Sequence, residues 1–223
     1  MPLFADVPAA AVIVFYLHGF ASSAQSTKAG FFGERLREHG IELRAPDFNE
    51  PEFATLTVTR MLDRLGAELI RLEEPAVLMG SSLGGMLAIL AAATFPARVS
   101  RLVLMAPAVM FAKPGHHLLT PERIDDWRRR GALPFFHYAY NEERPLNYAF
   151  YEDSLRHDAF ETRFDQPTLI FQGLRDASVD CRTVEQFART RPNVTLSLLD
   201  DDHQLIASLP RMWEGAAEFL GLV

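Results

Sequence analysis

The amino-acid sequence predicts an α/β protein with a mostly parallel, twisted β-sheet and helices on both faces. Short apolar runs rich in β-branched residues alternate along the chain with amphipathic helical segments. The pentapeptide Gly80-Ser81-Ser82-Leu83-Gly84 lies between one such run and one such segment, where a strand must turn sharply into a helix. We expect a single domain over residues 1–223, because 48% hydrophobic residues suffice for one large core and no obvious linker divides the chain.

The predicted strands and helices follow one another in a regular order. The predicted strands are residues 11–17, 41–45, 76–79, 99–105, 168–172 and 194–198. The predicted helices lie between them, at residues 26–40, 55–72, 83–95, near 183–189 and around 210–220. Ser26 as an N-cap and Gly40 as a stop bound the first helix, while Pro75 and Pro96 mark the ends of the next two.

The interval at about residues 108–166 interrupts this order, and we expect it to form a small lid over the C-terminal edge of the sheet. It contains a predicted helix with Thr120 as N-cap and Gly131 at its end. Several aromatic residues follow, spaced in part by two as in a hairpin: Phe135, Phe136, Tyr138, Tyr140, Tyr148, Phe150 and Tyr151.

Ser82 is the candidate nucleophile because it is the central serine of the Gly-x-Ser-x-Gly pattern. Such a pentapeptide also occurs in ordinary turns, but a strand before it and a helix after it favour the catalytic interpretation. Gly80 and Gly84 flank a turn in which a Cβ would collide with neighbouring backbone. The serine is then held at a helix N-terminus, where negative charge is favoured. We expect Ser81 to be a packed neighbour.

A serine hydroxyl needs a base to take its proton and an acid to orient that base. Asp176 and His203 follow two later predicted strands, in the order serine, acid, histidine, and both therefore belong to the edge of the sheet where Ser82 lies. Asp180 and the run 200–202 are competing acids, although an acidic run is usually a solvated loop.

Two backbone N–H groups are expected to stabilise the oxyanion of a tetrahedral intermediate. One belongs to Leu83, directly after the nucleophile. We assign the other to Phe20 in the loop after the first strand, with Ala21 as the alternative; Phe20 is also a candidate wall of the substrate pocket. We interpret His18 as a brace of this loop through hydrogen bonds and not as the base.

Together these residues resemble the α/β-hydrolase superfamily. The resemblance rests on His18-Gly19-Phe20, Gly80 to Gly84, Gly173 to Asp176 and His203, and it covers essentially the whole chain. It is closest to compact bacterial serine esterases with a short lid. It implies hydrolysis of an ester or thioester through an acyl-enzyme, and no cofactor. Relatives with an aspartate nucleophile match poorly because Ser82 occupies that position.

Composition and charge restrict the partners. A formal net charge of -7 argues against binding to nucleic acid. The single cysteine, Cys181, fits a cytoplasmic location, the N-terminus lacks the basic region of a signal peptide, and we expect no membrane span. We interpret His116 and His117 as surface or lid residues and expect no metal. The predicted partner is a small-molecule ester, and the protein is expected to be a monomer or a homodimer.

The aromatic lid favours an apolar acyl group or an aryl group over a sugar or a peptide. Thioesterase, carbon-carbon hydrolase, amidase and perhydrolase activity are alternatives, since all can use the same triad. A different class also stays open, in which the chain is a binding protein of the same fold that turns over slowly or not at all.

Overall fold

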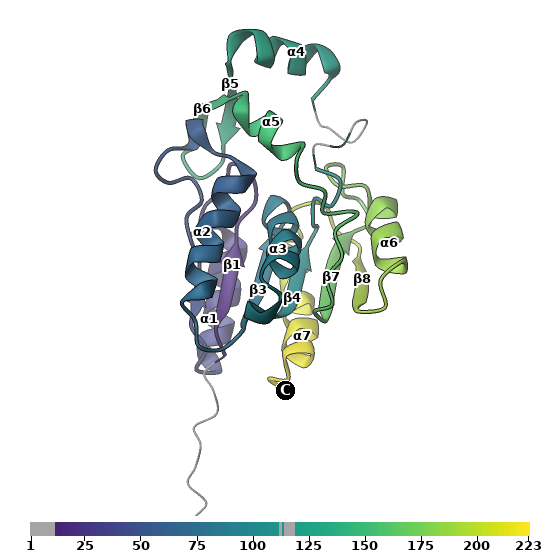
Figure 1. Ribbon diagram of the computed structural model, residues 1–223. Helices are drawn as coiled ribbons and strands as arrows, with labels where there is room; N and C mark the ends of the chain where they lie inside the picture. Colours follow the sequence, from purple (N-terminus) through teal and green to yellow (C-terminus); the bar gives the residue numbers. More distant parts are fainter. Residues whose placement is uncertain (1–11, 112, 114–118) are drawn as a thin grey trace, which may run out of the picture.

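The computed structural model describes residues 12–111, 113 and 119–223 of the protein (Figure 1). The central sheet has six strands in the order β2-β1-β3-β4-β7-β8, and every neighbouring pair is parallel. Their bounds are β1 (Val14–Leu17), β2 (Leu43–Arg44), β3 (Ala76–Ser81), β4 (Val99–Met105), β7 (Thr168–Gly173) and β8 (Val194–Leu199). All six strands therefore end at one edge of the sheet.

Helices cover both faces of this sheet (Figure 1). One face carries α1 (Thr27–Glu38) and α7 (Leu209–Leu220), and the other carries α2 (Val58–Ile70), α3 (Leu83–Thr94) and α6 (Cys181–Arg189). Successive side chains of a strand point to opposite faces, so Val14 and Tyr16 pack in one core while Phe15 and Leu17 pack in the other. Burial on both faces explains why the central strands are almost continuously apolar.

Several predicted bounds differ from the observed ones. The first strand begins at Val14 and not at residue 11, which lies outside the described residues, and β2 is only two residues long. Helix α2 begins at Val58 because the Thr57 side chain caps it by accepting a hydrogen bond from the Arg60 N–H at 3.0 Å. The expected Ser26 cap is present on α1, and Gly40 adopts a φ of 72° after that helix.

Within the lid segment, residues 108–166, the described helices and strands lie beyond the C-terminal ends of the strands of the central sheet, at the top of Figure 1, and residues 155–166 lead from them back to β7. Its described elements are α4 (Pro121–Arg130), β5 (Ala132–His137), β6 (Glu142–Asn147) and α5 (Ala149–Ser154). Strands β5 and β6 form an antiparallel hairpin. The aromatic residues from Tyr148 onward belong to α5 and the turn before it and not to the hairpin, while Phe135 and Phe136 are in β5.

Two further predictions from the sequence concerned the histidine pair of the lid segment and the absence of a membrane-spanning helix. His116 and His117 lie outside the described residues. Among the residues that are described, no helix is long and apolar enough to cross a membrane.

Candidate active site

Ser82 stands at the turn between β3 and α3 in a strained backbone conformation. Its φ of 52° lies in the left-handed region, which a residue with a Cβ seldom adopts. A Cβ on Gly80 would overlap the backbone of Gly84, and one on Gly84 would overlap the carbonyl oxygen of Leu17. The two glycines let strand, turn and helix pack this closely, and the turn presents the serine at the N-terminus of α3.

A chain of hydrogen bonds joins three predicted site residues. The His203 Nε2 lies 3.1 Å from the Ser82 Oγ, and its Nδ1 lies 2.8 Å from the Asp176 Oδ2. The carboxylate accepts from Nδ1–H, and this tautomer leaves Nε2 free to accept the serine proton. Asp176 is completely buried as a side chain, whereas the His203 side chain retains 21% exposure.

The surroundings of Asp176 favour its ionised form. Burial opposes ionisation, but hydrogen bonds from His203 and from the backbone N–H groups of Val179 and Ser178 together hold the pKa of Asp176 below its ordinary value. The Gln172 side-chain amide donates a further hydrogen bond to the Asp176 Oδ2 at 3.0 Å. The acid is thus fixed in place and negatively charged beside the imidazole.

The competing acids make other contacts. Asp180 caps α6 by accepting from the Arg182 N–H, and Asp201 is buried and accepts from the N–H groups of Asp202 and Ser208. Asp200 pairs with Arg175 at 3.4 Å, and Asp202 accepts from the Gln204 N–H. Within the described residues, Asp176 is the carboxylate that hydrogen-bonds to His203.

The two predicted oxyanion donors belong to two segments that adjoin Ser82. Leu83 is the first residue of α3, and Phe20 belongs to the β1 loop, which we define as residues 18–22. A Cβ on Gly19 would lie 3.5 Å from the Ser82 Cβ, so this loop packs directly against the nucleophile. The N–H groups of Phe20 and Leu83 donate no hydrogen bond to any other described residue.

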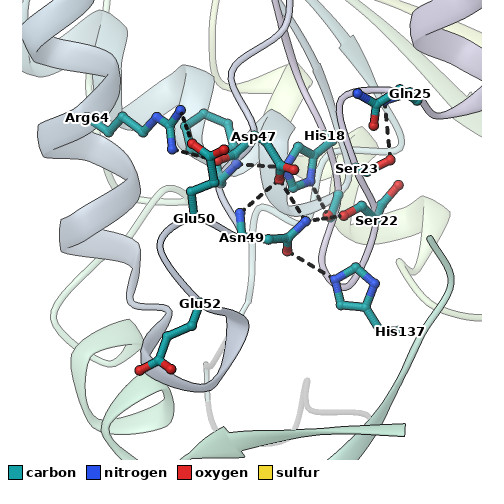
Figure 2. A network of polar contacts seen from close by, with 12 residues as sticks. His18, Ser22, Ser23, Gln25, Asp47, Asn49, Glu50, Glu52, Arg64 and His137 are labelled. Carbon is teal, nitrogen blue, oxygen red and sulfur yellow. Dashed lines mark hydrogen bonds and ion pairs between the residues drawn. The ribbon is translucent and has the colours of Figure 1, made fainter. Parts of the chain in front are cut away.

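His18 is buried, and the hydrogen-bond partners of its two ring nitrogens are backbone groups and not Ser82. Its Nε2 accepts a hydrogen bond from the Phe48 N–H at 3.0 Å, and its Nδ1 lies 2.9 Å from the Gly19 carbonyl oxygen (Figure 2). Since Nε2 carries no proton in this arrangement, its 3.5 Å approach to the Asp47 carboxylate is not a hydrogen bond. The ring therefore ties the β1 loop to the chain after β2.

A cavity of about 1050 Å³ opens at Ser82 and His203 beneath the lid segment. Apolar and aromatic side chains of the lid segment form one part of its wall, including Met110, Phe111, Trp127, Phe135 and Phe150. The Phe20 ring lies 5.4 Å from that of Phe150 and 5.6 Å from that of Phe135, centroid to centroid. The Phe20 side chain is thus part of the pocket wall, while its N–H lies in the loop beside Ser82.

Two supporting residues did not emerge from the sequence. Gln172 is completely buried in β7, and a glutamine directly after the apolar run Leu169–Phe171 was a signal that could have drawn attention to it. Lys28 is 7% exposed, lines the cavity, and donates from Nζ to the Gln204 carbonyl oxygen at 2.7 Å. No local pattern marks Lys28, because its partner lies 176 positions away in the sequence.

Solved structures with the same fold belong to hydrolases. Est1E from Butyrivibrio proteoclasticus, solved with ferulic acid bound, gives a TM-score of 0.81 at 21% identity, covering 94% of this chain and 88% of that one. Alpha/beta hydrolase domain-containing protein 10 from mouse gives 0.77 at 22% identity, covering 93% and 89%. A monoacylglycerol lipase from Paleococcus ferrophilus gives 0.77 at 16% identity, covering 94% and 95%. The fold is that of the α/β-hydrolases, and this sequence prediction is confirmed.

The chain belongs to the uncharacterised protein family UPF0227, whose sequence pattern matches residues 13–219. Comparison with curated proteins gives no significant match. At 16 to 22% identity the solved neighbours establish the fold, and the reaction has to be argued from the site itself.

Proposed function

We propose that the protein is a serine hydrolase that cleaves carboxylic esters through an acyl-enzyme. The observation that carries this proposal is the hydrogen-bonded chain from the Ser82 Oγ through His203 to the buried Asp176, of which Ser82 and His203 line the cavity. A nucleophile, a base within hydrogen-bond distance and an acid that orients the base are the parts that acyl transfer requires.

In the acylation half, the Ser82 Oγ attacks the ester carbonyl carbon while His203 Nε2 accepts the hydroxyl proton. The carbonyl electron pair moves to oxygen, and the N–H groups of Phe20 and Leu83 hold the resulting oxyanion. When the tetrahedral intermediate collapses, the bond to the alcohol oxygen breaks and His203 returns the proton to it. Asp176 orients the imidazole and stabilises its cationic form throughout.

In the deacylation half, a water molecule attacks the acyl carbon of the ester formed on Ser82, and His203 accepts the proton of that water. The second tetrahedral intermediate collapses by breaking the bond to the Ser82 Oγ, which regains a proton from His203. The carboxylic acid product then leaves the cavity. The aromatic wall favours a short to medium acyl group or an aryl group, because such groups gain from apolar burial.

The proposed substrate is a small-molecule ester, and the proposed location is the cytoplasm, an expectation that rests on the single cysteine. Thioester, amide, carbon-carbon and peroxide chemistry use the same residues, and a panel of substrates with matched acyl groups separates them. A binding protein with slow turnover is the candidate from another class, and it would show ligand-induced thermal stabilisation without turnover.

The test is hydrolysis of p-nitrophenyl acetate, butyrate and octanoate by the wild type, Ser82→Ala and Ser81→Ala. Intact mass is measured after treatment with a fluorophosphonate. We expect the wild type and Ser81→Ala to turn over and to gain one adduct, and Ser82→Ala to do neither. If folded wild-type protein neither turns over nor gains an adduct, the proposal is wrong and the binding-protein alternative takes its place.

A further inference from the structure

The β1 loop has a backbone conformation that needs support from its surroundings. Ala21 adopts a φ of 51°, in the left-handed region, which is unfavourable for a residue with a Cβ. This residue directly follows Phe20, whose N–H is the proposed oxyanion donor. The direction of that N–H therefore depends on whatever holds the loop in this conformation.

The lid hairpin makes direct contact with the β1 loop. The Tyr138 N–H, just after β5, donates a hydrogen bond to the Ala21 carbonyl oxygen at 2.9 Å. His137, the last residue of β5, is completely buried, and its Nε2 lies 3.1 Å from the Asn49 Oδ1 (Figure 2). The hairpin thus contacts the loop once through its backbone and once through a side chain that leads to Asn49.

Asn49 completes this connection. The residue is 4% exposed, and its Nδ2 donates at 2.8 Å both to the Ser22 carbonyl oxygen and to the Asp47 Oδ1 (Figure 2). Because both partners are acceptors, the amide nitrogen must face them, and the Asn49 Oδ1 faces His137. The Nε2 of His137 must then carry the hydrogen.

In each of these contacts the hydrogen is donated toward the β1 loop. His137 donates to Asn49, Asn49 donates to the Ser22 carbonyl, and Tyr138 donates to the Ala21 carbonyl. Two successive peptide units after Phe20 are therefore held by groups that depend on the lid hairpin and on Asn49. In the described part of the chain, the buried Nδ1 of His137 has no hydrogen-bond partner, so the ring contributes to this network through Nε2.

We propose that Asn49 and His137 are positioning residues that hold the β1 loop so that the Phe20 N–H points at the oxyanion. The inference rests on the proposed serine-hydrolase function and adds to it a role for the lid segment. The hairpin covers the substrate, and it also orients one of the two oxyanion donors. Loss of either side chain then weakens transition-state binding more than substrate binding.

The variants are chosen to separate this role from general stability. Asn49→Ala and His137→Leu remove the network, while His137→Gln keeps an N–H donor near the position of Nε2. Thr59→Val is the matched control, because the Thr59 Oγ1 donates to the buried Asp153 of α5 at 2.6 Å and so anchors the lid segment away from the β1 loop. Asn49→Ser replaces Asn49→Ala if that protein does not fold.

The measurements are kcat and KM for p-nitrophenyl butyrate, together with the inhibition constants of an alkyl trifluoromethyl ketone and of the matching methyl ketone. The Ser82 Oγ adds to the carbonyl carbon of the fluorinated ketone while His203 Nε2 accepts the hydroxyl proton, and the carbonyl electron pair moves to oxygen to form an oxyanion that needs the Phe20 N–H. The methyl ketone binds mainly as an unreacted carbonyl. The ratio of the two constants therefore reports on the oxyanion donors, and a merely structural contact would not change it.

We expect Asn49→Ala and His137→Leu to lower kcat about 10-fold or more with little change in KM, and to weaken only the fluorinated ketone by a similar factor. His137→Gln should recover most of both effects, and Thr59→Val should lower the melting temperature without changing the ratio. The inference is overturned if folded Asn49 and His137 variants keep the wild-type ratio, or if they behave as Thr59→Val does. A wild type without turnover or fluorophosphonate adduct contradicts instead the proposed function.

Discussion

The Nζ of Lys28 donates a hydrogen bond to the Gln204 carbonyl oxygen at 2.7 Å and so joins the first turn of α1 to the residue that follows His203. Burial of the ammonium group, partly offset by the nearby Asp202, Asp201 and Asp176, lowers the pKa of Lys28 to about 8. The protein therefore keeps an amine at a place where burial disfavours its charged form. We expect this amine to position the His203 loop, by which we mean residues 200–208 between β8 and α7.

Lys28→Met should change the pH dependence of stability in a defined direction. The folded pKa of about 8 lies below the ordinary value of 10.5, so the unfolded chain binds more protons between these two pH values. The wild type should therefore gain stability relative to Lys28→Met as pH rises from 8 to about 10, and the difference should be constant below pH 8. Urea unfolding of both proteins at several pH values measures it.

The same Lys28→Met variant should lose about 10-fold or more in kcat at pH 7, because the His203 loop loses an anchor and the base moves relative to Ser82. Arg211→Met on the exposed face of α7 is the control for loss of a cation. Wild-type turnover by Lys28→Met would show that the loop is held without the amine.

Gly84, in the turn that holds Ser82, gives a second prediction about stability. Gly84→Ala would place a Cβ against the carbonyl oxygen of Leu17, and this backbone atom cannot move without disturbing the sheet. We expect the free energy of unfolding to fall by more than about 3 kcal/mol.

Gly30→Ala is the matched control for Gly84→Ala. Gly30 lies exposed within α1, and a Cβ there meets no atom within 4 Å. This variant should gain about 0.5 to 1 kcal/mol from the higher helix propensity of alanine. Chemical unfolding measures both changes, and equal effects of the two substitutions would contradict the packing argument.

Substitution of Asp176 should reduce mainly kcat, whereas substitution of Asp201 should reduce mainly the stability of the fold. Asp176→Asn should lower kcat by roughly 10⁴, because an amide at this position favours the wrong tautomer of His203. Asp201→Asn should keep kcat within about 3-fold and should lower stability by about 1 to 3 kcal/mol, because the Ser208 N–H loses a charged partner. Steady-state kinetics and thermal unfolding distinguish the two. A large loss of kcat in Asp201→Asn would reassign the acid.

Lowering the pH should reduce the difference in the free energy of unfolding between the wild type and Asp201→Asn. Burial opposes ionisation of Asp201, but hydrogen bonds from the N–H groups of Asp202 and Ser208 hold its pKa below the ordinary value. With a depressed folded pKa, the stabilisation is present above the ordinary value and is lost as pH falls below about 4. Unfolding curves at pH 7, 4 and 3 test this, and a constant difference would contradict it.

The layout of the sheet could be read from the sequence because local rules decide it. The apolar runs around Val77, Val103 and Ile170 need burial on both faces, and the spacing of apolar residues in 55–72 needs a helix. The ends of elements were less accurate, since a single side chain such as Thr57 decides where a helix begins. The hairpin of the lid segment was expected, but its aromatic residues after Tyr148 belong to α5.

Thus the sequence by itself determined the parallel sheet, the sharp turn at Ser82 and the order of Ser82, Asp176 and His203, because each depends on a few neighbouring residues. Only the tertiary structure decided which carboxylate hydrogen-bonds to His203 and which groups hold the β1 loop. His137 and Asn49 are 88 positions apart, and Lys28 and Gln204 are 176 apart. Contacts over such separations depend on how whole elements pack, and no short pattern in the chain records them.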